Sequence, residues 1–110
     1  MDKRIFHITS EREATEAQTS GEYIPHDFPR EGFIHCSYEH QLEGVFKRRF
    51  QGRSDLVLLE IDPSQLTCQV IDENLEGGTE LFPHIYGRLP MSAVKIRSIR
   101  SISGLSFPSI

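Results

Sequence analysis

The stretch Asp55-Leu56-Val57-Leu58-Leu59-Glu60-Ile61-Asp62 is a nearly continuous apolar run in the middle of a 110-residue chain. Such a run, interrupted by a single charged residue, predicts a strand that is buried on both faces of a sheet. The pair Asp62-Pro63 ends the strand, since both residues are typical of turns. We therefore expect a central strand over residues 56–61.

Two strands and two helices are expected to alternate before this central strand. Ser10 and Glu13 have the spacing of a capping box at the start of the first helix, and Gly21 is a typical residue for its end. Ser37 is expected to cap the second helix, whose apolar residues recur at helical spacing up to Phe50. The expected strands cover residues 4–9 and 32–36, the expected helices 10–21 and 37–50, and a proline-containing loop 22–31.

The segments after the central strand have the patterns of strands and turns only. Strands are expected over residues 68–71, 81–86 and 94–99, with a turn over 87–90. Because the helices come early and the strands late, the order predicts an α+β domain over residues 1–100. The expected fold is a split, mostly antiparallel sheet with two N-terminal helices. Residues 101–110, which are rich in serine, are expected to form an irregular C-terminal tail.

Charge and cysteine content exclude several classes of protein. The chain has 12 basic and 16 acidic residues, a net charge of -4 with neutral histidines, which argues against a general nucleic-acid or membrane-surface binder. Cys36 and Cys68 match no zinc spacing, and the N-terminus lacks the pattern of a signal peptide. No apolar run approaches the roughly 20 residues of a membrane span. We expect a cytoplasmic protein with reduced cysteines.

Three of the five histidines fall inside expected strands, with apolar neighbours on each side. They are His7, His35 and His84, whereas His26 and His40 are expected to be solvated. Each imidazole has two ring nitrogens that need partners, so any one of the three could be a hydrogen-bonded structural histidine. Three histidines in comparable settings favour a shared cleft, and we take all three as candidate catalytic residues.

Arg49 is unusual because, at 100° per residue, it falls within the apolar stripe of the second expected helix. A guanidinium in that place needs an anion, which could belong to a ligand or to a structural ion pair with Glu60 or Glu80. Either carboxylate could also orient a histidine, and Glu80 is taken as a fourth catalytic candidate. Tyr86, at the end of the strand that carries His84, is counted among the ligand-binding candidates.

Several strings of the sequence together resemble one family, the mainly bacterial domain of unknown function 952 family. The resemblance covers residues 4 to 97. The strings are Ile5-Phe6-His7-Ile8-Thr9, Glu31-Gly32-Phe33-Ile34-His35-Cys36-Ser37, Asp55 to Asp62 as quoted above, and Glu80-Leu81-Phe82-Pro83-His84-Ile85-Tyr86-Gly87.

The order of these strings is also similar, more distantly, to that in RNA 2'-phosphotransferases. Those enzymes belong to the ADP-ribosyltransferase superfamily, which splits NAD at the nicotinamide ribose. The resemblance implies an ADP-ribosyltransferase-like fold with NAD as substrate. His7 and Thr9 match the first motif, whose histidine bonds the ribose, and His35 and Ser37 match the second, which supports the nicotinamide pocket. Arg49 would then contact a phosphate.

The third motif of that superfamily is not recognisable, and His84 or Glu80 is proposed for it. Ile8 stands where the superfamily usually has glycine after the first histidine.

Three functions therefore stay open for a site whose partner is expected to be a small molecule or nucleotide. The first is an ADP-ribosyltransferase-like enzyme that acts on NAD or an ADP-ribosyl compound. The second is a non-catalytic module that binds a nucleotide or small metabolite. The third is a metal-dependent enzyme in which the three strand histidines and a water hold zinc. No closely spaced histidine pair is present, so no metal is expected.

Overall fold

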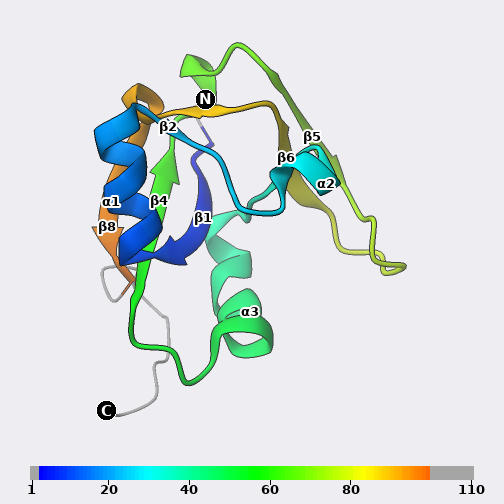
Figure 1. Cartoon of the computed structure of the whole chain (residues 1–110). Helices are drawn as coiled ribbons and strands as arrows, with labels where there is room; N and C mark the ends of the chain where they lie inside the picture. Colours follow the sequence, from blue (N-terminus) through cyan, green and yellow to red (C-terminus); the bar gives the residue numbers. More distant parts are fainter. Residues whose placement is uncertain (1–2, 100–110) are drawn as a thin grey trace.

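A computed structural model describes residues 3–99 as two antiparallel sheets, a short two-stranded ribbon and the helices packed against them (Figure 1). The first sheet has the order β1 (Ile5–Ser10), β4 (Leu56–Ile61), β8 (Val94–Ser98). The second has the order β3 (Ile34–His35), β6 (Phe82–Tyr86), β5 (Gln69–Glu73). The ribbon pairs β2 (Glu22–Tyr23) with β7 (Leu89–Pro90). The expected antiparallel arrangement is confirmed.

Within residues 3–99, an isolated bridge between Phe6 and Ser37 joins the backbones of the two sheets. Phe6 in β1 and Ser37, just after β3, exchange two backbone hydrogen bonds, each 2.8 Å long. Strands β1 and β3, which belong to different sheets, therefore run side by side at this seam. Side chains from both strands can consequently reach the same space.

The first helix, α1 (Glu11–Ser20), begins and ends as its sequence predicts. The hydroxyl of Ser10 accepts a hydrogen bond from the backbone N–H of Glu13 (3.1 Å), which satisfies one free donor of the first turn. Gly21 ends the helix with φ of 92°, a left-handed conformation that glycine adopts without steric cost. Ala14 and Ala17 are the buried residues of this helix, so it packs closely on the first sheet.

The second helical segment differs from the prediction in both its start and its geometry. It consists of a 3₁₀ turn (Glu39–Gln41), a short α3 (Leu42–Val45) and a π-helical turn (Phe46–Phe50). Ser37 does not cap it, because its backbone is engaged at the seam; instead the side-chain oxygen of Gln41 accepts from the Tyr38 N–H (2.9 Å). The predicted apolar stripe is confirmed, since Leu42 and Phe46 are buried against β1 and β4.

Two expected loops contain short regular elements instead. A one-turn helix, α2 (Phe28–Glu31), and strand β2 lie in the expected loop 22–31, and β7 lies in the expected turn 87–90. Strand β5 also continues two residues beyond its predicted end, which places Glu73 on the second sheet. The C-terminal tail predicted over 101–110 lies outside the described residues.

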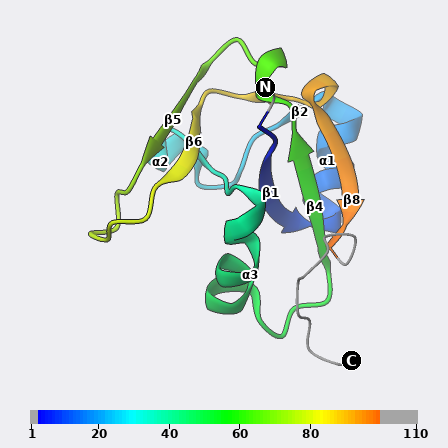
Figure 2. The same ribbon diagram turned by 180° about the vertical axis from the view of Figure 1, so that it is seen from behind.

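The core lies on both sides of the first sheet, with one cluster against α1 and the other against α3 (Figure 2). Leu58 and Leu59 are both 0% exposed and belong to opposite core clusters, so the central strand is buried on both faces as predicted. Cys36 and Cys68 are free thiols. Within residues 3–99, none of the helices has the length and apolar content of a membrane span.

We expect Gly87→Ala to lower the free energy of unfolding, because a Cβ there would lie 2.6 Å from Cβ and 2.9 Å from Sγ of Cys68. Overpacking of this kind costs about 1–3 kcal/mol, measurable by urea denaturation. Gly44→Ala is the matched control, since its Cβ meets only the mobile end of Arg48 and alanine favours a helix by up to about 1 kcal/mol. If the two variants had the same free energy of unfolding, the close approach of Gly87 to the Cys68 side chain would be contradicted.

Candidate functional site

A cleft of about 190 Å³ opens at the seam between the two sheets. The π-helical turn (Phe46–Phe50) borders it on one side and the loop after β5 on another. Its wall combines apolar side chains such as Phe6 and Phe82 with polar and charged ones. The structure brings five of the eight candidate residues to this cleft: His7, His35, His84, Ser37 and Arg49.

His7 lines the cleft, but both of its ring nitrogens are bonded within the protein. Nδ1 lies 2.5 Å from the backbone oxygen of His35, and Nε2 lies 2.8 Å from the hydroxyl of Tyr23. A carbonyl oxygen can only accept, so Nδ1 carries the proton in the neutral ring. Burial lowers the pKa of His7, which favours this neutral form. The ring thus ties β1 to β3 across the seam and has no nitrogen left for a ligand.

Thr9 lies behind His7 rather than in the cleft. It is buried, its hydroxyl lies 3.1 Å from that of Tyr23, and it donates to the carboxylate of Glu13 (2.9 Å). Tyr23 has one hydroxyl proton, which goes to Nε2 when His7 is neutral with its proton on Nδ1. Burial raises the pKa of Tyr23, so this hydroxyl stays protonated. The Thr9 side chain is therefore held by Glu13 and does not line the cleft.

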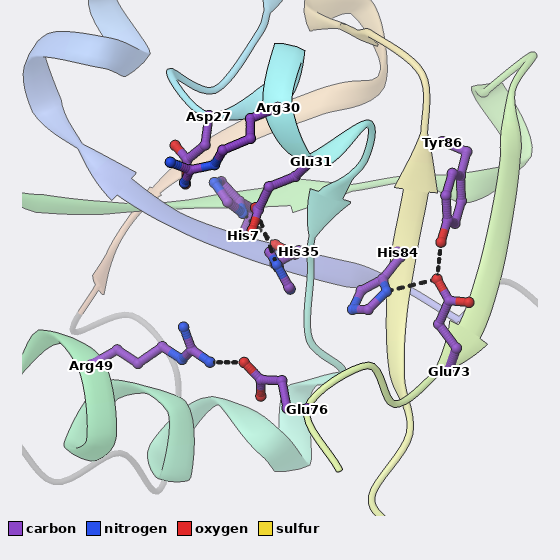
Figure 3. A network of polar contacts seen from close by, with 10 residues as sticks. All are labelled: His7, Asp27, Arg30, Glu31, His35, Arg49, Glu73, Glu76, His84 and Tyr86. Carbon is purple, nitrogen blue, oxygen red and sulfur yellow. Dashed lines mark hydrogen bonds and ion pairs between the residues drawn. The ribbon is translucent and has the colours of Figure 1, made fainter. Parts of the chain in front are cut away.

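His84 is buried, and one of its nitrogens is held by a carboxylate. Its Nδ1 lies 2.9 Å from Oε2 of Glu73, the same oxygen that accepts a hydrogen bond from the hydroxyl of Tyr86 (Figure 3). These two hydrogen bonds, from Tyr86 and from His84, hold the pKa of Glu73 below its usual range. Tyr86 is thus near the site but contacts it through Glu73, and it does not itself line the cleft.

His35 lies directly opposite His84 in the β3–β6 pair, with ring centroids 4.8 Å apart. Its Nε2 is 3.4 Å from the carboxylate of Glu31, and its side chain is 41% exposed. Burial, with a smaller contribution from His84, lowers the pKa of His35. His35 therefore presents a neutral and accessible ring to the cleft.

Arg49 was expected within the apolar stripe, and this expectation is wrong. Its side chain is 53% exposed and forms an ion pair with Glu76 of the loop after β5, and not with Glu60 or Glu80 (Figure 3). The π-helical turn is wider than an α-helix, so positions counted at 100° per residue are displaced there. Arg49 and Arg48 both line the cleft, so the two guanidinium groups stand at its rim.

Neither carboxylate that was singled out in the sequence reaches the histidines. Glu80 is exposed and accepts from Gln41 (3.2 Å), and Glu60 pairs with Arg97 (2.5 Å) on the first sheet. Glu73 stands in their place next to His84. The strand alternation carries a signal for it: Ile71 pairs with His84, so a strand extended by two residues puts Glu73 on the same face and diagonal to that ring.

The three strand histidines do not converge as a set of metal ligands. A three-histidine site needs a free nitrogen from each ring, and both nitrogens of His7 are engaged with His35 and Tyr23. Across residues 3–99, no group of three histidine, cysteine or acidic side chains has the arrangement of a metal site.

Comparison with solved structures finds this fold in the protein CC0527 from Caulobacter crescentus. The crystal structure of the protein CC0527 from Caulobacter crescentus is 31% identical, with a TM-score of 0.74 over 84% of this chain and 81% of that one. The solution NMR structure of CC0527 is 31% identical, with a TM-score of 0.72 over 84% and 80%. A family model described as protein of unknown function (DUF952) matches residues 8–96. A search of curated proteins finds no match.

Proposed function

This chain belongs to the DUF952 family of proteins of unknown function, and from that premise we propose that its cleft binds an ADP-ribosyl compound such as NAD. One observation carries the proposal. Residues that match the second motif of the ADP-ribosyltransferase superfamily, His35 and Ser37, line the same cleft as Arg49, the residue expected to contact a phosphate.

The composition of the cleft wall suits a ligand of this kind. Phosphates are bound by guanidinium groups, which Arg48 and Arg49 offer at the rim. A ribose needs neutral hydrogen-bonding groups, and flat rings need an apolar surface such as that of Phe50 and Phe82. A nucleotide-like molecule combines these three requirements. The alternative of a non-catalytic binding module would use the same contacts, so binding is the property to test first.

The proposed contacts differ in one respect from those that the resemblance implies. His7 would be the ribose contact by the motif, but its two nitrogens are bonded to His35 and Tyr23. We assign the ribose contact to the ring of His35 instead, because it is accessible and faces the cleft.

The change Arg49→Met should weaken the binding of NAD and of ADP-ribose by about ten- to a hundredfold. A charge-assisted contact to a phosphate contributes roughly 1.5–3 kcal/mol, which methionine cannot replace. The melting temperature should change little, since the pair with Glu76 is half exposed and such pairs contribute about 0–1 kcal/mol. Isothermal titration calorimetry and thermal melts of both proteins measure these two effects.

Arg12→Met provides the matched control. Arg12 also forms an exposed ion pair, with Glu16 on α1, but does not line the cleft. It should bind both ligands as the wild type does. If the wild type shows no heat of binding at millimolar ligand, or if Arg12→Met and Arg49→Met weaken binding equally, the proposed site is wrong.

A further inference from the structure

The pairing of β5 with β6 places three hydrogen-bonded polar side chains next to the cleft: His84, Glu73 and Tyr86. Ile71 pairs with His84, and Glu73, two residues farther along β5, faces the same side of the sheet. Its Oε2 accepts hydrogen bonds from His84 Nδ1 and from the Tyr86 hydroxyl, so the carboxylate is held from two directions. Nδ1 of the His84 ring therefore has a fixed partner in Glu73.

This arrangement determines which nitrogen of His84 faces a ligand. An ionised carboxylate only accepts, so Nδ1 carries the proton and Nε2 keeps its lone pair in the neutral ring. Nε2 points away from Glu73, into the space bounded by His35 and the Arg49–Glu76 pair (Figure 3). The ring plane is fixed by stacking on Phe33, with centroids 4.4 Å apart and planes inclined by 24°.

The contrast with His7 argues against a purely structural histidine. Both nitrogens of His7 are bonded to protein groups, as expected for a ring that only holds strands together. In the part of the chain described by the structure, Nε2 of His84 has no hydrogen-bond partner, although its side chain is only 3% exposed. A buried histidine with one nitrogen fixed by a carboxylate and the other facing a cleft has the geometry of a general base.

We infer that His84 is the general base of this cleft and activates a water molecule for hydrolysis of the N-glycosidic bond in the NAD-type ligand. The inference rests on the proposed function for the class of ligand. Glu73 and Tyr86 are positioning residues that act through His84.

The proposed step balances without a further reactant. Nε2 of His84 takes a proton from water, and the water oxygen forms a bond to the anomeric carbon of the ribose. The bond from that carbon to the nicotinamide nitrogen breaks, and its electron pair leaves with nicotinamide, which becomes neutral. The imidazolium, compensated by Glu73, then releases its proton to solvent. The products are ADP-ribose, nicotinamide and one proton.

The test measures nicotinamide release from NAD by the full chain, with ligand affinity measured in parallel by calorimetry. Glu73→Gln and His84→Gln should each lower the turnover number by about 10²- to 10⁴-fold, the usual contribution of a general base. The affinity of His84→Gln for NAD should change by less than about threefold, because this variant keeps Arg48, Arg49 and the carboxylates that line the cleft. Asp72→Asn, the neighbouring carboxylate on β5 that bonds Tyr38 instead, is the matched control and should keep wild-type turnover.

A second measurement determines which ring nitrogen of His84 carries the proton, and it does not rely on turnover. In the neutral ring of His84, nitrogen-15 NMR of the wild type should find the proton on Nδ1, and Glu73→Gln should shift the tautomer toward Nε2–H. Finding the Nε2–H tautomer in the wild type, or wild-type turnover in Glu73→Gln, would overturn the assignment. Intact NAD binding without nicotinamide release above a buffer blank would overturn the general base and leave the proposed binding function standing. Absence of binding by the wild type would instead remove the proposed function, and the hydrolysis with it.

Discussion

Replacing Leu59 by alanine is expected to lower the free energy of unfolding by about 3–5 kcal/mol, the upper part of the range for buried leucines. Leu59 is 0% exposed and lies in the middle strand of the first sheet, opposite His7 in β1 and Ile96 in β8. Strands held on both sides leave little room for the core to collapse into the space that the side chain vacates. The loss is a large part of the roughly 5–15 kcal/mol that stabilises a domain of this size.

Denaturation in urea measures this loss, with Leu81→Ala as control. Leu81 is 53% exposed, so its truncation should change stability by no more than about 0.5 kcal/mol. A Leu59→Ala variant that loses less than about 1 kcal/mol would mean that the central strand can repack, contrary to its position between β1 and β8.

The elements that the sequence predicts well are those with strong local signals. The apolar run gives β4 over the same residues as expected, and the Ser10, Glu13 and Gly21 pattern gives both ends of α1. In each case the deciding interactions lie within a few residues of one another. A single sequence contains that information directly.

The elements that it misses depend on contacts far away along the chain. Strands β2 and β7 are two residues long and exist only because they pair with each other across more than sixty residues. Ser37 has good chemistry for a helix cap, but its backbone bonds Phe6 at the seam, and the helix begins after Tyr38. Tertiary pairing overrides the local preference in both places.

In the candidate site, too, some residues could be predicted from the sequence and others depend on distant contacts. The three strand histidines reach one cleft because β1 and β3 meet at the seam and β6 pairs with β3. The carboxylates that accompany them were misassigned, since Glu73 and Glu76 come from a strand end and a loop whose positions no local pattern specifies. The likeness to RNA 2'-phosphotransferases and the use of NAD stay predictions.

His7→Ala is expected to lower the free energy of unfolding by about 2–4 kcal/mol. The change removes two hydrogen bonds. It leaves the buried His35 carbonyl without its side-chain partner, at a cost of roughly 1–3 kcal/mol, and leaves the Tyr23 hydroxyl only the Thr9 hydroxyl as acceptor. In a Tyr23→Phe background the same change should cost less, because only the His35 carbonyl then loses a partner. His26→Ala, at an exposed histidine, should leave stability nearly unchanged.

The pH dependence of stability gives His7 a second signature. Burial lowers its pKa in the folded protein from the usual value of 6.5, so the unfolded chain takes up a proton at higher pH than the folded one does. The stability contributed by neutral His7 is therefore present above about pH 6.5 and is lost as the pH falls toward its folded pKa. Because the pKa of His35 is lowered as well, the His7→Ala variant should keep part of this decline, with a shallower slope between about pH 7 and 5.

The stability of His7→Ala and its dependence on pH distinguish two roles of the His7 ring: joining the sheets or contacting the ligand. A ring that joins the sheets predicts a less stable variant with a flatter pH profile, and any change in NAD affinity would follow from the altered seam. A ligand contact, the role that the distant resemblance implies for His7, predicts weaker binding at unchanged stability. Denaturation of His7→Ala at several pH values, beside calorimetric titration of NAD, separates the two. Since both ring nitrogens are bonded across the seam, we expect the first result.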